Sequence, residues 1–388
     1  MKRTLIALAL SATLPLVYAQ STPSKSTSKG WEFGAVLDLT HTTRPLALGM
    51  RDQGLQLGHS DLTASGPVGN WLRGHVGAVF ETHDGKLEKA IEEAYLETTA
   101  LPYGLQARVG RFASQIGHLN QQHMHADDFT ERPLLYRAFF GGHWNDDGVR
   151  VNLTLPTSFY WMVGGEAFKG KKLVAETWDS VKNPGVATLV TKIGGDLNRA
   201  NSWQLGLSYI KSRRVAALEE EHEHDEDHDE DHDDHGHEAH EHGHGAMFSG
   251  RNTWMVDGTW KWSPSGNNRE QQVRVGFEAA RITKLNPSAG SGDKHQAQAL
   301  SVVYRFNPSW EVGARADWLR VSQPHDEHFH TGRLREQSLM LAWKPTHMQS
   351  LRLQVAKQSG AQEIEGASKR TVQLQYVIAL GAHGAHSF

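Results

Sequence analysis

The chain has 388 residues, with no cysteine, 38 glycines, 24 histidines and a formal net charge of −4. The absence of cysteine excludes a disulfide framework, a thiolate zinc site and catalysis by a cysteine nucleophile. A charged fraction of 22% argues against wholesale disorder, while a mean hydropathy of −0.53 combined with abundant glycine suits a membrane β-barrel with a polar interior.

The first segment, residues 1–19, predicts a cleaved signal peptide. Lys2 and Arg3 precede a short apolar run, Leu5 to Val17, and small residues suitable for cleavage end at Ala19. The run is too short for a membrane helix, which needs about 20 apolar residues. The protein is therefore expected to be exported by a bacterium. Residues 20–30, rich in Ser, Thr and Lys, are expected to form a flexible lead-in.

From residue 31 onward, apolar residues alternate with polar ones at the period of a β-strand. We identify about sixteen such segments of roughly 9 to 12 residues, the length that a tilted strand needs to cross a bilayer. These segments start near residues 31, 52, 70, 89, 104, 146, 158, 187, 201, 251, 270, 295, 309, 334, 349 and 371.

Short connections rich in Gly, Pro, Asn and Ser alternate with long ones. This pattern predicts an all-β protein: a closed antiparallel transmembrane β-barrel over residues 31–388, with short periplasmic turns and long extracellular loops. The long connections are expected at 42–51, 82–88, 113–145, 169–185, 213–250, 285–294, 322–333 and 359–369.

The architecture resembles the Gram-negative porins. Tryptophans lie near the predicted strand ends and the chain finishes in Phe388, an aromatic end common in outer-membrane barrels. Gly110-Arg111-Phe112 and Asp147-Gly148-Val149-Arg150, which flank 113–145, are loosely similar to the phosphate-selective branch. The resemblance implies a homotrimer in outer-membrane lipid, and a third outer loop, 113–145, that folds inward and narrows the pore.

Residues 219–245 form a tract with nine histidines and fourteen acidic residues. Neutral imidazole and carboxylate together suit zinc, and also nickel, cobalt or copper. The repeated spacing predicts several exchangeable ions rather than one fixed cage; the alternative is a solvated acidic loop without chemistry. The expected ligands are His222, His224, His228, His232, His235, His237, His240, His242 and His244.

A second group of histidines and carboxylates falls in other long connections of the same rim. The resemblance places those of 113–145 near the constriction, but each one taken singly is equally well a surface histidine. The candidates for this second metal group are His118, His123, His125, Asp127, Asp128, His143, His325, His328 and His330.

By strand parity, several arginines face the barrel interior and would favour anions. Glu278, Glu311, Asp257 and Asp317 share that parity, so walls of mixed charge are equally consistent. The candidate lumen charges are Arg108, Arg150, Arg274, Arg315 and Arg352.

These patterns predict a channel and not an enzyme, because no catalytic constellation is found on adjacent strands. We expect an outer-membrane channel that captures divalent transition metal, zinc foremost, on its outer loop and allows passive uptake, with no obligatory cofactor and no nucleic-acid partner. The alternative is a general or anion-selective porin whose acidic loop is incidental or adhesive. The direction of transport, uptake or efflux, stays open.

Overall fold

A computed structural model describes residues 30–174, 183–215, 245–325, 328–360 and 370–381. The expected signal peptide, the lead-in up to residue 29, and residues 219–244 of the histidine tract lie outside the described residues. The predictions made for them therefore stay predictions.

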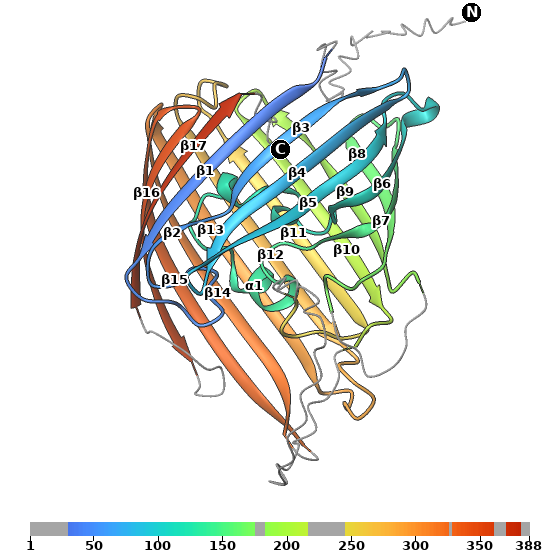
Figure 1. Cartoon of the computed structure of the whole chain (residues 1–388), viewed down its shortest axis with the longest axis vertical. Coiled ribbons are helices and arrows are strands. Elements are labelled where there is room, and N and C mark those ends of the chain that lie inside the picture. The colour runs from blue at the N-terminus through green and yellow to red at the C-terminus, as the bar shows by residue number, and fades with distance from the viewer. Residues whose placement is uncertain (1–29, 175–182, 216–244, 326–327, 361–369, 382–388) are drawn as a thin grey trace, which may run out of the picture.

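The described chain forms one closed antiparallel sheet around an interior (Figure 1). Apart from β2 and β3, which both pair with β1, each strand pairs with the next one along the chain. β17 closes the ring on β1 from Gly34↔Gly381 to Thr42↔Gln373. The strands are β1 (Glu32–Thr42), β2 (Gly54–Leu57), β3 (Ser60–Val68), β4 (Leu72–His83), β5 (Lys86–Thr98), β6 (Leu105–Ala113), β7 (Asn145–Thr154), β8 (Tyr160–Phe168), β9 (Val186–Asn198), β10 (Asn201–Ser212), β11 (Asn252–Trp262), β12 (Gln272–Thr283), β13 (Lys294–Asn307), β14 (Trp310–His325), β15 (His328–Thr346), β16 (Gln349–Gly360) and β17 (Arg370–Gly381).

β2 and β3 are two pieces of one interrupted strand. β2 pairs with the second half of β1, and β3 pairs with its first half, in the same antiparallel direction. Counting them as one gives a barrel of sixteen strands. The predicted fold class is confirmed, and the strand starts agree with those expected to within a few residues, with β15 as the exception.

The outer surface of the barrel is apolar. Along β1, Phe33 and Leu37 face outward with 68% and 41% of their surface exposed, while Asp38 and Thr40 face inward and are fully buried. The same alternation continues around the ring. A water-soluble protein rarely exposes a continuous apolar belt of this size, whereas a barrel in lipid requires one.

Two expected long connections are corrected by the structure. β4 and β5 are joined not by 82–88 but by the two residues Asp84 and Gly85, whose φ angles of 49° and 71° are those of a tight hairpin turn. The strands β14 and β15 run through the expected loop 322–333 and pair as far as His325↔His328. Pairing of backbone groups needs no apolar side chains, so polar sequence did not prevent this hairpin.

Residues 114–144, which we call the inward segment, lie within the ring of strands (Figure 1). The segment contains two short 3₁₀ turns, Leu119–Gln121 and Met124–Ala126, and the helix α1 (Leu134–Phe140). All seven residues of α1 are buried, and the helix ends at Gly141 in the left-handed conformation typical of a helix terminus. None of the helices in the described residues is long and apolar enough to cross a membrane.

The inward segment packs against the barrel wall through an apolar core and a buried ion pair. Leu135, Phe139 and Trp144 belong to one apolar cluster with the wall residues Phe168 and Met255. The Arg137 guanidinium lies 2.5 Å from the Glu336 carboxylate of β15, and both side chains are at most 1% exposed. The segment therefore narrows the interior, and it packs against wall residues from β8 to β15.

Candidate metal centre

A β-bulge in β5 turns two successive carboxylates into the barrel. Gly77 of β4 pairs with Glu93, but the next residue, Ala78, pairs with Ile91, so Glu92 is an extra residue. A bulge of this kind breaks the two-residue alternation of side chains. As a result Glu92 and Glu93 are both 7% exposed, while Ile91 faces outward.

The break between β2 and β3 places two further polar side chains beside this bulge. His59 and Asp61, separated only by Ser60, are 3% and 4% exposed. The break needs a glycine at Gly58, because a Cβ atom there would overlap the Arg51 guanidinium and lie 2.5 Å from Asp38 Oδ2. The wall is thus irregular at the same place on both sides of β4, which pairs with β3 and with β5.

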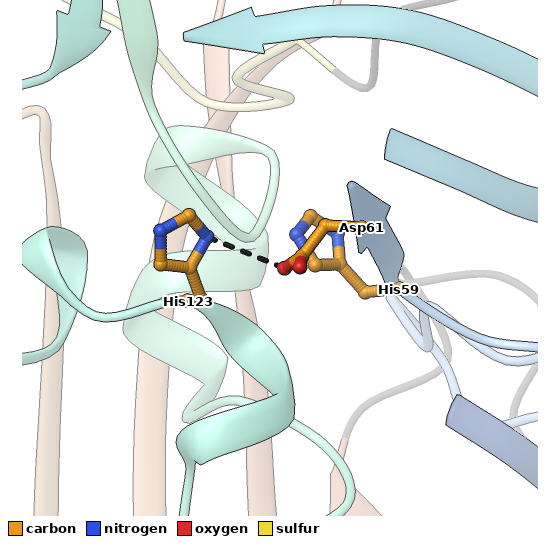
Figure 2. A group of neighbouring side chains, drawn as sticks. All are labelled: His59, Asp61 and His123. Atoms are coloured by element: carbon orange, nitrogen blue, oxygen red, sulfur yellow. Dashed lines mark ion pairs between the residues drawn. The ribbon is translucent and has the colours of Figure 1, made fainter. Parts of the chain in front are cut away.

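The inward segment brings histidines to the same place. Figure 2 shows His123 approaching from the segment, on the side opposite to His59 and Asp61. The imidazole Nδ1 of His123 lies 3.7 Å from Asp61 Oδ2 and 3.5 Å from Glu92 Oε2. His125 Nδ1 lies 3.1 Å from Asp61 Oδ2. We call His59, His75, Asp61, Glu92, Glu93, His123, His125 and His143 the lumen cluster.

Two contacts of Glu92 Oε2 in the lumen cluster, to His59 and to His123, are longer than good hydrogen bonds and close to the spacing of ligand atoms in a metal site. His59 Nε2 lies 3.3 Å from Glu92 Oε2, and one ligand atom each of His59, Asp61 and His123 fall within 4.8 Å of one another. Four atoms bound at about 2.0–2.1 Å to a tetrahedral zinc ion lie roughly 3.3 Å apart. The cluster therefore has nearly the dimensions that such an ion requires.

Several of these ligand atoms are buried without a hydrogen bond. Within the described part of the chain this holds for both ring nitrogens of His59, Oδ2 of Asp61, Nδ1 of His123 and Nε2 of His143. A buried polar atom without a partner costs free energy, and native proteins contain few. Imidazole and carboxylate atoms in this state form a donor set suited to zinc, nickel, cobalt or copper.

The electrostatics of His123 match this arrangement. Burial lowers the pKa of the imidazole, but the surrounding carboxylates of Glu92, Glu93 and Asp61 outweigh burial and raise it to about 9. The cluster thus already attracts one positive charge, a proton, at the position where a cation would lie.

The other residues of the predicted second metal group lie elsewhere. Asp127 pairs with Arg132 at 2.7 Å and Asp128 with Arg274 at 2.5 Å. His118 hydrogen-bonds Gln122, and burial together with Lys192 and Lys261 lowers its pKa to about 3. His325, His328 and His330 lie on the β14–β15 hairpin. Of the seven candidates whose side chains the structure describes, it brings together His123, His125 and His143.

The candidate lumen arginines contact inward-facing groups. Four of them meet carboxylates: Arg108 with Glu97, Arg150 with Glu166, Arg274 with Asp128 and Glu311, and Arg315 with Asp317 and Glu336. Arg352 donates instead to the backbone carbonyl of Asp127 and to Gln375. The described interior is therefore of mixed charge.

Sequence reasoning missed the wall residues of the lumen cluster: His59, His75, Asp61, Glu92 and Glu93. Strict alternation would place the side chains of Glu92 and Glu93 on opposite faces of the sheet, and the bulge is what places both of them on the inner face. A weak signal existed, because two adjacent acidic residues interrupt an otherwise alternating strand.

The comparisons with known proteins support the fold. No family model matches the chain. An uncharacterized protein of Aquifex aeolicus (strain VF5) is 25% identical over 365 residues, covering 87% of this chain and 70% of that protein.

Among solved structures, OprB of Pseudomonas putida has a TM-score of 0.57 at 10% identity, covering 91% of this chain and 94% of that one. The anion-selective porin from Comamonas acidovorans has a TM-score of 0.53 at 11% identity, covering 91% of this chain and 99% of that one. The trimer form of Vibrio cholerae OmpT, an outer membrane protein, has a TM-score of 0.52 at 10% identity, covering 90% of this chain and 98% of that one. The chain has the closed sixteen-strand barrel of these outer-membrane proteins.

Proposed function

We propose that this protein is a porin-type channel of the outer membrane through which divalent transition-metal ions, zinc foremost, diffuse into the cell. The observation that carries the proposal is the lumen cluster, in which imidazole and carboxylate groups converge inside the barrel between its wall and the inward segment. The exposed apolar belt and the similar folds of known outer-membrane proteins support the channel part of the proposal.

The route would use two kinds of site. The histidine tract, with its nine histidines, would raise the local metal concentration and bind several exchangeable ions, because its repeated imidazole and carboxylate groups offer many alternative ligand sets. His123 is 30% exposed, so the lumen cluster can accept ions from water in the interior. Acidification would release metal, because imidazole must be neutral to bind it.

The second candidate function is a general or anion-selective porin. It is favoured by Arg274 and Arg305, which both face one interior cavity together with Lys261 and Lys344. Carboxylates in contact with these cations, Glu311 and Asp128, reduce the net positive charge there. Under either function, the apolar exterior would contact outer-membrane lipid and the assembly would be a homotrimer.

Zinc flux into proteoliposomes tests the proposal. We expect the intact chain to transport zinc. A chain with the nine tract histidines replaced by serine should transport zinc more slowly at low zinc concentration, and His123→Ala should slow zinc transport more than that replacement does. His118→Ala is the matched control, because His118 lies on the same segment outside the cluster. Equal zinc flux in all four chains, together with anion preference in the reversal potential, would instead establish the general porin.

A further inference from the structure

We propose that His59, Asp61, Glu92 and His123 bind a single divalent transition-metal ion, and that this ion fastens the inward segment to the barrel wall. The inference deepens the proposed function and rests on it only for the supply of the ion. The ligand class is two imidazole nitrogens and two carboxylate oxygens, a set that zinc binds in tetrahedral geometry.

Three of the ligands, His59, Asp61 and His123, have ligand atoms within 4.8 Å of one another, and Glu92 Oε2 contacts two of these three residues. Asp61 Oδ2 lies 3.7 Å from His123 Nδ1, which lies 3.5 Å from Glu92 Oε2, which lies 3.3 Å from His59 Nε2. An ion among these atoms would replace three long contacts by four short bonds. It would also satisfy Nε2 of His59, Oδ2 of Asp61 and Nδ1 of His123, which are buried and have no hydrogen bond within the described residues.

The remaining members of the cluster contact the ligands from behind. His143 Nδ1 lies 2.7 Å from Glu92 Oε1, the oxygen that points away from His59 and His123. Glu93 Oε2 lies 3.9 Å from His123 Nε2, the nitrogen opposite the one that faces Asp61. Groups that touch the far side of a ligand in this way fix its orientation and strengthen metal binding.

The ligands come from two separate parts of the barrel. Asp61 belongs to β3, His59 to the break before it and Glu92 to β5, on the two sides of β4, whereas His123 belongs to the inward segment. The α1 end of the segment is already held to β15 by the ion pair between Arg137 and Glu336. A bound ion would hold the other end, around the turn Met124–Ala126, to β3 and β5.

Zinc titration calorimetry tests the ligand set, in a full-length chain whose nine tract histidines are replaced by serine. We expect one zinc ion per chain. His143→Asn, which removes the 2.7 Å contact with Glu92, should weaken binding about 10–100-fold. Glu92→Gln and His123→Asn should weaken it by more, whereas His118→Asn should bind as the parent does. Circular dichroism of each variant checks that the barrel is folded. Absence of stoichiometric binding in the folded parent, or binding that ignores both Glu92→Gln and His123→Asn, overturns the proposal.

Hydrogen exchange tests the fastening. In the same parent, saturating zinc should slow amide exchange in residues 119–126 at least several-fold, and His123→Asn should abolish this protection. If saturating zinc left amide exchange in these residues unchanged, the proposal that the ion fastens the inward segment to the barrel wall would be refuted. A chain that binds and fastens zinc in this way but passes none in the flux assay would contradict the proposed function alone.

Discussion

His123 connects the inward segment to the barrel wall through both of its ring nitrogens. Its two ring nitrogens lie within 4 Å of carboxylates from three positions, Asp61, Glu92 and Glu93. These charges raise its pKa to about 9 against the opposing effect of burial. In the metal-free protein the imidazole is therefore protonated at neutral pH, and a metal ion must displace that proton.

This charge state predicts how zinc binding depends on pH. Since the proton is present below the raised pKa and is lost as pH rises through it, zinc affinity should increase by about tenfold for each pH unit between neutrality and that pKa. Calorimetry at about pH 7 and pH 8, in the chain with tract histidines replaced, measures the slope.

His118→Asn is the control for this slope. The pKa of His118 is lowered to about 3, so the imidazole is neutral across this range and its replacement should leave the slope unchanged. Zinc affinity that does not vary between the two pH values would contradict the charge state assigned to His123.

At the scale of elements, the helix α1 is tied to β15 by buried charges. Glu336 accepts from Arg137 at 2.5 Å and from Arg315 at 2.8 Å, and all three side chains are almost completely buried. Removing one partner of a buried ion pair leaves an uncompensated charge, which costs far more than the loss of an exposed pair. Glu336 is thus the point at which the inward segment is most sensitive to substitution.

Glu336→Ala should reduce the free energy of unfolding by about 3–5 kcal/mol. It should also raise single-channel conductance and its fluctuation, because α1 loses its anchor and can leave the interior. Thermal unfolding and planar-bilayer recordings measure the two effects.

The neighbouring substitution Gln337→Ala serves as control, since Gln337 is exposed on the outside of the same strand. We expect it to change neither quantity. If Glu336→Ala conducted like the parent, α1 would not be the constricting element.

The positions of the strands were predictable because alternation and turn residues are local properties of the sequence. The lengths of turns and hairpins were harder to predict from the sequence. Asp-Gly is a common pair in two-residue hairpin turns, yet Asp84-Gly85 and the polar residues around it were assigned to a longer loop. The loop histidines of the lumen cluster were found from composition, but their wall partners were not. Finding Glu92 and His59 requires the register of β5 on β4 and the break in β2–β3, which depend on pairing across the sheet.

At the scale of the whole molecule, the barrel is closed by backbone pairing that does not involve the histidine tract. β10 and β11, the strands on either side of it, pair directly from Asn201↔Trp262 to Lys211↔Asn252. The tract and the barrel can therefore be altered separately, and their contributions to metal handling can be measured apart.

Replacing the nine tract histidines with serine should leave the barrel folded, with unchanged single-channel conductance. The number of zinc ions bound per chain should fall toward one, because the lumen cluster remains. Equilibrium dialysis counts the ions, and heat-dependent mobility in detergent gels reports folding. A folded variant that retains all of the parent's zinc would show that the tract does not bind metal.

The extra residue in β5 has a consequence for how such a site could arise in evolution. Without Glu92, Ile91 would point outward and Glu93 inward, and the strand would be an ordinary piece of barrel wall with Glu93 and Glu97 as inward carboxylates. Insertion of a single codon adds a further inward carboxylate beside Glu93 and leaves every other side chain of the strand on its original face. A barrel with a plain polar interior can therefore gain a metal ligand in one genetic step, without any change to its closure or strand number.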